Sequence, residues 1–438
     1  MLCGDGMSML FKRIVIFLTS MMYCLCLFLS CYNFWLRSLD DDYITDEIVL
    51  PRIDLDGDIS NMNDKKDERV IELSYSSDSI NFKKFVKIKI QGSSSIKYEK
   101  KNYTIKLYED EKCTDKFKVD MGWGKENKYV LKANWVDKTH SRNIVSARLT
   151  ADIYKKYGVL SESVNNGEID GYPVEVYNNG EFLGLYTFNI PKDAWLFGLD
   201  EKNANHLAFE AEYANYETRF RMNVSEYKAW VLEVGEENEE NLKKLNRLID
   251  FILNSSDQEF KNNFNDYFDY EATLNYYIIA NVLHLRDNCT KNMMLISYDG
   301  EIWYPILYDL DTSFGVNAYG NSLYENDSDV NLEKNKLFAR FSKLYSVEIA
   351  ERYFELRQDI LTKENLNKEL DDFIKSIPLS VFYKEEERWG EIPGYGVSQI
   401  KDFINSRFDY LDVEMSKKYD IVPDCESDKT NNYCKIFD

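Results

Sequence analysis

RDNCTKNMMLISYDGEIWYPILYDLDTSFG, residues Arg286 to Gly315, places two acidic motifs at the two ends of a predicted β-hairpin. Asp287 and Asn292 stand five residues apart, directly after a long apolar stretch. The apolar runs that follow are typical of two strands turned by an Asp-Gly pair. Because a hairpin returns its second strand to the start of its first, the pattern predicts that Asp309 lies close to Asp287.

Phosphoryl transfer is one interpretation of this pattern. It requires one carboxylate to orient the attacking hydroxyl, and a second carboxylate with an amide to hold Mg²⁺ against the phosphates. Asp287 and Asn292 have the spacing of the protein-kinase catalytic loop, in which the Asp is the base and the Asn a metal ligand. The same spacing also fits an ordinary helix end at Asp287 with Asp309 in a turn.

A second stretch suits phosphate binding. QGSSSIKYEKKNYTIKLYED, residues 91 to 110, is a Gly-Ser loop that runs into a strand carrying lysines. Small residues let backbone N–H groups approach a phosphate, and a lysine on a strand supplies the counter-charge. Taken alone, the loop also fits a plain turn with lysines facing solvent.

The order of the elements predicts an α+β protein. With 438 residues, the chain is long enough for two or three folded units. Up to about residue 200 the pattern is mostly strand, interrupted by one helix at 141–158 with Ser141 as N-cap and Gly158 as its end. After about residue 225 the chain is mainly helical, and Asp269 is the expected N-cap of one of these helices.

The N-terminus carries a segment that could cross a membrane. Residues 14–36 contain no charge, Lys12 and Arg13 precede them, and residues 40–42 are acidic. This length and charge asymmetry predict that the folded part lies outside the cytoplasm. The segment fits an uncleaved anchor, a long signal peptide, or a lipoprotein signal with Cys31 as the lipidated residue.

Charge and cysteine content exclude several functions. A net charge of −22 argues against DNA, RNA or an anionic lipid surface as the main partner, since these need clustered Lys and Arg. Four cysteines lie beyond the N-terminal segment, of which Cys425 and Cys434 could close a small loop in an oxidising compartment. Three scattered histidines and no CxxC pair argue against a zinc site.

An ordered set of motifs resembles the CotH spore-coat protein kinases, an atypical branch of the protein-kinase-like fold, over residues 69 to 412. The first of the five is the GSSSIKYEKKNYTIKL stretch, and the fourth is the Asp-x-x-x-x-Asn loop that opens at Asp287. The other motif residues are Asp137, Arg142 and Asn143; Asn179, Gly180, Gly184 and Tyr186; and Tyr308, Asp309, Asp311 and Gly315. Several motifs in order are far more specific than any one of them.

The resemblance implies a two-lobed kinase that transfers the ATP γ-phosphate to Ser or Thr of surface or spore-coat proteins, with Mg²⁺ or, alternatively, Mn²⁺. It implies Asp287 as the catalytic residue. The implied metal ligands are Asp309, Asn292 and Asp311, and the implied cofactor-binding residues are Gly92, Ser94, Lys101, Lys106 and Arg142. Either Lys101 or Lys106 would contact phosphate, and Lys132 in VLKAN is a third candidate because it mimics the VAIK pattern of ordinary kinases.

We therefore expect four parts. They are a membrane anchor or signal segment (1–42), a β-rich N-lobe (43–210), a helical C-lobe with the catalytic loop (211–415) and a polar tail (416–438). The protein would be membrane-anchored with its folded part outside the cytoplasm, or secreted or in the spore coat.

The sequence departs from the family pattern at Gln91, Glu99, Tyr308 and Ile190, the last of which lies where a kinase hinge would meet adenine. These departures favour an alternative, a catalytically weak or inactive kinase-like surface or coat protein that acts as a structural or assembly partner. A secreted glycosidase using Asp309 and Asp311 as paired carboxylates is a third interpretation.

Overall fold

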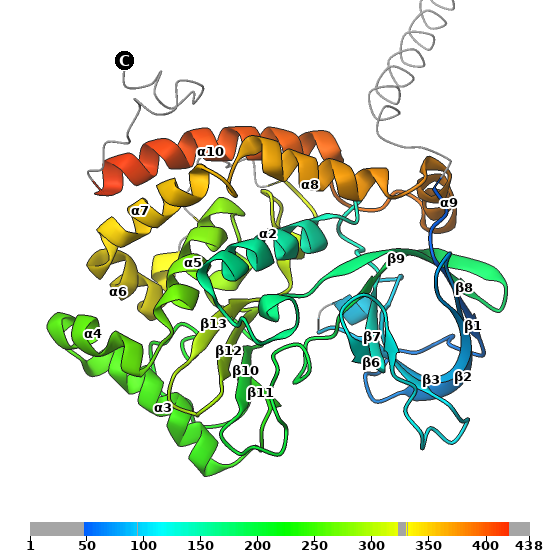
Figure 1. Ribbon diagram of the computed structural model, residues 1–438, viewed down its shortest axis with the longest axis horizontal. Helices are drawn as coiled ribbons and strands as arrows, with labels where there is room; N and C mark the ends of the chain where they lie inside the picture. The colour runs from blue at the N-terminus through cyan, green and yellow to red at the C-terminus, as the bar shows by residue number, and fades with distance from the viewer. Residues whose placement is uncertain (1–47, 94, 323–329, 331, 420–438) are drawn as a thin grey trace, which may run out of the picture.

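The computed structural model describes residues 48–93, 95–322, 330 and 332–419. The expected membrane segment at 14–36, Ser94 and the Cys425–Cys434 loop lie outside the described residues. Within the described part, no helix has both the length and the apolar character needed to cross a membrane. The fold is mixed α+β, with a β-rich N-terminal region and a mainly helical C-terminal part (Figure 1).

The β-rich region closes into a seven-stranded barrel in the order β1-β2-β3-β4-β7-β9-β8. The strands pair antiparallel except for β1 and β8, whose parallel pairing closes the barrel. Their bounds are β1 Arg52–Asp56, β2 Glu68–Ser76, β3 Asn81–Gln91, β4 Asn102–Tyr108, β7 Lys128–Lys132, β8 Gly171–Asn178 and β9 Glu181–Asn189. A small hairpin, β5 Val119–Asp120 and β6 Lys125–Glu126, lies between β4 and β7.

Alternation along the strands places apolar side chains inside the barrel and polar ones outside it. On β7, Tyr129 and Leu131 are fully buried in the barrel core, whereas Lys128, Val130 and Lys132 alternate with them. Successive side chains of a strand point to opposite faces, so these three residues share the outer face. This face of β3, β4 and β7 forms one wall of the candidate site.

The β8–β9 hairpin follows the predicted turn. Asn179 and Gly180 adopt positive φ values of 49° and 82°, the conformation that a tight Asn-Gly hairpin turn requires. The register runs from Asn178 opposite Glu181 to Gly171 opposite Asn189. The predicted hairpin is therefore confirmed.

Helix α2 (Arg142–Tyr157) packs against α5 (Tyr270–Val282) and α8 (Lys363–Lys375), and lies between the C-terminal helices and the second sheet (Figure 1). Gly158 ends it with φ 69°, as the sequence predicts. Ser141 occupies the N-cap position, but its side chain does not cap the helix. Instead, a carboxylate oxygen of Asp137 accepts a 2.8 Å hydrogen bond from the N–H of Arg142.

A second sheet has the strand order β11-β10-β12-β13, with β10 Leu207–Ala211, β11 Trp230–Val234, β12 Met293–Ser297 and β13 Tyr304–Leu307. The antiparallel β12–β13 pair confirms the hairpin predicted between the two acidic motifs. β10 lies across the boundary expected between residues 210 and 211, and it pairs with β11 and β12 rather than with the barrel.

The remaining helices are α3 Glu239–Asn254, α4 Asp257–Asn263, α5 Tyr270–Val282, α6 Lys336–Leu344, α7 Ser346–Arg357, α8 Lys363–Lys375, α9 Leu379–Trp389 and α10 Val397–Tyr419. Apart from α9, they pack against one another, against β13 or against α2. The Asp269 side chain caps α5 by accepting a 2.7 Å bond from the N–H of Ala272, as predicted. Helix α9, late in the chain, leaves this group and packs beside β8 and β9 of the barrel (Figure 1).

Candidate active site

A cavity of about 400 Å³ lies between the outer face of β3, β4 and β7 and the second sheet. Eight lysines line it, namely Lys65, Lys89, Lys100, Lys106, Lys128, Lys132, Lys192 and Lys291. The carboxylates that line it are Glu210, Glu212, Glu233, Asp287, Asp309 and Asp311. This local excess of positive charge, in a chain of net charge −22, suits an anionic ligand.

The Asp287 loop follows α5 and is tied to the strand that carries Asp309. Asp287 opens a short 3-10 turn, η4 (Asp287–Cys289), and its carbonyl accepts a 2.8 Å bond from the N–H of Lys291. The Asn288 side-chain amide donates to the carbonyls of Asn292 at 3.0 Å and Tyr308 at 2.9 Å. Asn288 therefore fixes the loop against the end of β13.

The Asp309 turn has an unusual backbone. Asp309 adopts φ 55° and ψ 64°, the left-handed region that Asp tolerates better than most side chains. The Asn143 side-chain oxygen accepts a 2.9 Å bond from the N–H of Leu310 and so holds this turn against α2. The Lys132 ammonium lies 2.5 Å from Asp309 Oδ1 and 3.9 Å from Asp311 Oδ2.

Burial and mutual charge perturb the three carboxyls. Burial raises the pKa of Asp287, and the Asp309 charge adds to this while Lys291 opposes it. Burial and the neighbouring Asp309 carboxylate raise the pKa of Asp311 to about 7. Burial acts to raise the pKa of Asp309 too, but the Lys132 ammonium outweighs it and the pKa lies below its ordinary value. Asp309, whose pKa is lowered, and Asp311, whose pKa is raised, therefore lie near each other in the site.

The donor set fits Mg²⁺. Among the described residues, no group of three or more His, Cys, Asp or Glu side chains is placed to enclose a metal ion. Mg²⁺ does not require such a cage, because it is commonly held by one or two carboxylates together with water and substrate phosphates. The mutual repulsion of Asp309 and Asp311, which raises the pKa of Asp311, is what a divalent cation would relieve.

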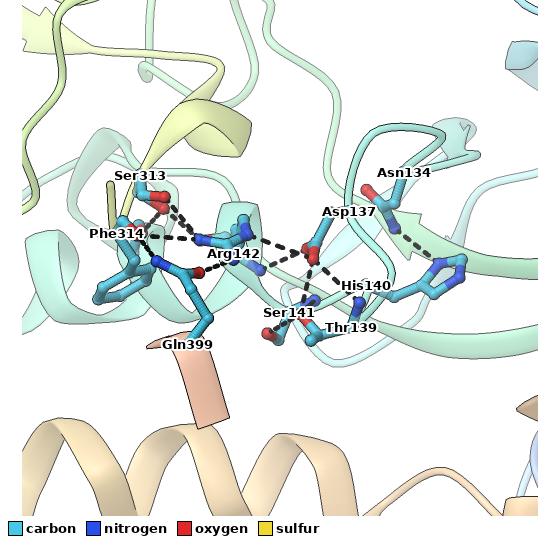
Figure 2. A network of polar contacts seen from close by, with 10 residues as sticks. Asn134, Asp137, Thr139, His140, Ser141, Arg142, Ser313, Phe314 and Gln399 are labelled. Carbon is cyan, nitrogen blue, oxygen red and sulfur yellow. Dashed lines mark hydrogen bonds and ion pairs between the residues drawn. The ribbon is translucent and has the colours of Figure 1, made fainter. Parts of the chain in front are cut away.

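Arg142 lies outside the cavity lining and is fully buried. Its guanidinium donates to the carbonyl of Ser313 at 2.8 Å and to the Gln399 side-chain oxygen at 2.6 Å. Gln399 in turn donates 2.8 Å to the carbonyl of Phe314 (Figure 2). The structure thus places Arg142 where it ties α2, α10 and the segment after Asp311 together, outside the cavity that the acidic candidates line.

The structure distinguishes the three lysines expected as candidates for contact with phosphate. Lys101 donates to the carbonyls of Ile96 at 2.7 Å and Tyr98 at 2.6 Å, which brace its own loop, and it does not line the cavity. Lys106 and Lys132 both line it. Gly92 also lines the cavity, so the structure brings it together with the three acidic candidates and Asn292.

Three residues that organise the site were not predicted from the sequence. Asn143 and Asn288 position the two acidic loops, and Glu385 forms a buried ion pair of 2.5 Å with Lys100, a residue of the cavity wall. Asn143 could have been found, because it belongs to the Arg-Asn motif that opens α2. Glu385 follows Lys100 by 285 residues, and no local pattern links the two.

Comparison with protein families identifies the family of the chain. A model of the CotH kinase protein family matches residues 88–411, which is most of the chain. No curated protein matches the sequence. The matched range contains the Gly92 loop, the Asp287 loop and the Asp309 turn. The chain therefore belongs to the CotH kinase family.

Proposed function

We propose that the protein is a kinase that transfers the γ-phosphate of ATP to a Ser or Thr hydroxyl of another protein. One observation carries the proposal: Asp287, Asn292 and Asp309 line one cavity, opposite a sheet face bearing lysines, in a chain of the CotH kinase family. In this proposal the barrel acts as the N-lobe of a kinase-like arrangement, and the second sheet with its helices acts as the C-lobe.

Different residues of the cavity would contact the phosphates and the base of the nucleotide. Lys132 is the phosphate-binding candidate closest to the acidic motifs, and Gly92 offers a backbone position without a side chain at the edge of the same cavity. Val130, on the same strand face as Lys132, supplies an apolar surface for the base. Arg142 would position the loop after Asp311 and would not touch the nucleotide.

In the chemical step, Asp287 accepts the proton of the acceptor hydroxyl. The hydroxyl oxygen forms a bond to the γ-phosphorus, the bond from that phosphorus to its bridging oxygen breaks, and ADP leaves with the electron pair. The raised pKa of Asp287 lies closer to neutral pH than the ordinary pKa of an aspartate, which favours general-base catalysis.

Asp309, Asp311 and Asn292 would hold Mg²⁺, and Mn²⁺ is accepted by the same oxygen ligands. When bound, the cation would neutralise negative charge on the β- and γ-phosphates. Lys132 then has two partners available, the Asp309 carboxylate and the phosphate chain. The low pKa of Asp309 keeps it ionised for this purpose.

We propose the surface of the cell or of the spore coat as the place of action. The uncharged segment at 14–36 would attach the protein to a membrane with the folded part outside, unless the segment is cleaved and the protein secreted. The acceptors would be surface or coat proteins with Ser or Thr. The net charge of −22 argues against nucleic acid as a partner.

The test is transfer of label from ATP to an acceptor protein by the wild type, by Asp287→Asn and by Asp309→Asn. We expect label with the wild type and a loss of at least about a hundredfold in both variants. Equal labelling by all three proteins would refute the assignment. If the wild type binds Mg-ATP in a thermal-shift assay but transfers nothing, the alternative of an inactive kinase-like structural or assembly partner replaces the proposal.

A further inference from the structure

One end of the cavity carries four lysines that phosphoryl transfer as proposed does not use. We call them the lysine end: Lys65, Lys89, Lys106 and Lys128. Lys106 and Lys128 are direct partners across the β4–β7 pair, and Lys89 stands opposite Thr104, two residues before Lys106. Like charges directly opposite one another in a sheet are destabilising. The arrangement therefore costs stability unless an anion compensates for it.

The protein itself provides little compensation. Lys65, Lys89 and Lys106 form no ion pair with any residue that the structure describes, and only Lys128 has a partner, Asp193 at 2.9 Å. The other cavity lysines differ, since Lys132 pairs with Asp309. The chain has 76 acidic residues against 54 basic ones, so acidic partners are not scarce.

The charges around Lys106 also favour a bound anion. Burial lowers the pKa of this ammonium, and the charges of Lys128 and Lys89 lower it further. Glu68, which acts in the opposite direction, is engaged by Lys87 at 3.2 Å. A bound anion would relieve this repulsion.

The lysine end lies apart from the acidic motifs along β7. Lys128 and Lys132 lie four residues apart on β7, which corresponds to roughly 13 Å along a strand. A phosphate held beside Asp309 and Lys132 therefore does not fill the lysine end, which can accept a second anionic group.

We propose that the lysine end is a second phosphate-binding subsite, distinct from the position of the transferred phosphate, for a phosphate or polyphosphate group at the far end of the cavity. Lysine ammonium groups bind phosphate as point charges from several directions and need no fixed geometry. Two sources share this chemistry: a phosphate on the ribose of a nucleotide, and free pyrophosphate or polyphosphate. The subsite does not depend on the proposed transfer reaction.

The experiment is calorimetric titration of the full-length protein with pyrophosphate in EDTA, so that no divalent metal contributes. We expect saturable binding by the wild type and binding at least about tenfold weaker by Lys89→Gln/Lys106→Gln. The single variant Lys65→Gln, in an exposed loop, should weaken binding to a smaller extent without perturbing the barrel. The control Lys66→Gln/Lys155→Gln removes two exposed lysines that do not line the cavity, and it should bind as the wild type does.

Two further titrations separate the sources. If a ribose phosphate occupies the subsite, adenosine 3′,5′-bisphosphate binds the wild type more tightly than AMP does, and the lysine-end variant loses this gain. If both nucleotides bind alike while pyrophosphate still depends on Lys89 and Lys106, free pyrophosphate or polyphosphate is the source. Absence of pyrophosphate binding by the wild type, or equal weakening in the lysine-end and control variants, would overturn the proposal. Because no transfer is measured, a failure here leaves the proposed kinase reaction untouched, and the reverse also holds.

Discussion

Glu385 of α9 is the counter-charge of a lysine that lies wholly inside the protein. Its Oε1 atom lies 2.5 Å from Nζ of Lys100, and its Oε2 atom accepts a 2.7 Å hydrogen bond from the N–H of Leu185 in β9. The Lys100 ammonium also donates to the carbonyl of Ala133 at 3.1 Å. The pair thus joins α9 to the barrel wall behind the cavity. Glu385→Gln preserves the size of this side chain and removes its charge.

We expect Glu385→Gln to lower the free energy of unfolding by about 3–5 kcal/mol at pH 7, the usual cost of removing one partner of a buried ion pair. The pKa of Lys100 points in the same direction. Burial already lowers the pKa of Lys100 from 10.5, and Glu385 opposes this effect. Removal of the carboxylate charge therefore further disfavours the charged lysine in the folded protein.

The sign of the pH dependence follows from the same lysine. In the unfolded variant Lys100 keeps its ordinary pKa of 10.5, whereas in the folded variant burial, no longer opposed by the Glu385 carboxylate, lowers its pKa below that value. Between these two values the unfolded state binds more protons, so stability rises with pH. The deficit of the variant should therefore shrink between pH 7 and pH 9, by at most about 1.4 kcal/mol per unit.

Urea unfolding at pH 7 and pH 9, followed by tryptophan fluorescence, measures both effects. Glu386→Gln, which removes an exposed carboxylate one residue further along α9, is the matched control and should change stability by less than about 0.5 kcal/mol. A loss below about 1 kcal/mol for Glu385→Gln at pH 7, unchanged at pH 9, would mean that Lys100 does not depend on this carboxylate.

Three further predictions concern the loops around the site and one buried histidine. Asn288→Ala should reduce phosphoryl transfer at least about tenfold through kcat rather than KM, because the Asp287 loop loses its attachment to the strand carrying Asp309; steady-state kinetics would reveal a mere binding defect as a change in KM alone. Gln399→Leu should cost about 1–3 kcal/mol in urea unfolding, since it leaves the buried Arg142 guanidinium without one acceptor, and a neutral result would contradict the network. Burial lowers the pKa of His284 to about 3, so this imidazole is neutral in the folded protein. The stability of the fold is therefore unaffected by His284 above its ordinary pKa of 6.5. As the pH falls from 6.5 towards 3, stability is lost by about 1.4 kcal/mol per pH unit, because only the unfolded state takes up the proton. Between pH 7 and pH 5 the free energy of unfolding should therefore fall less in His284→Asn than in the wild type. An equal fall in both proteins would show that His284 does not cause this pH dependence.

Local features of the fold could be predicted from the sequence. The Asp269 cap, the end of α2 at Gly158 and the turn at Asn179-Gly180 depend on residues a few positions apart, where side-chain type and backbone preference act directly. The β12–β13 hairpin belongs to the same class, and it brings Asp309 back to the Asp287 loop.

Contacts between distant segments could not be predicted in this way. The parallel pairing that closes the barrel joins Arg52 to Glu175, and periodicity within a strand does not specify its neighbour. The same holds for the buried pair of Lys100 and Glu385. The family resemblance implies a cofactor-binding role for Arg142, but a buried arginine satisfies carbonyl groups equally well, and its contacts with Ser313 and Gln399 depend on segments far away in the sequence.

The most direct test of the central claim compares ATP labelled at the γ-phosphate with ATP labelled at the α-phosphate, using one acceptor protein and Mg²⁺. Phosphoryl transfer through the Asp287 site predicts acid-stable label on Ser or Thr from the γ-labelled nucleotide only, and its disappearance in Asp287→Asn. Label from the α-position, or label from the γ-position that persists in Asp287→Asn, would contradict the account.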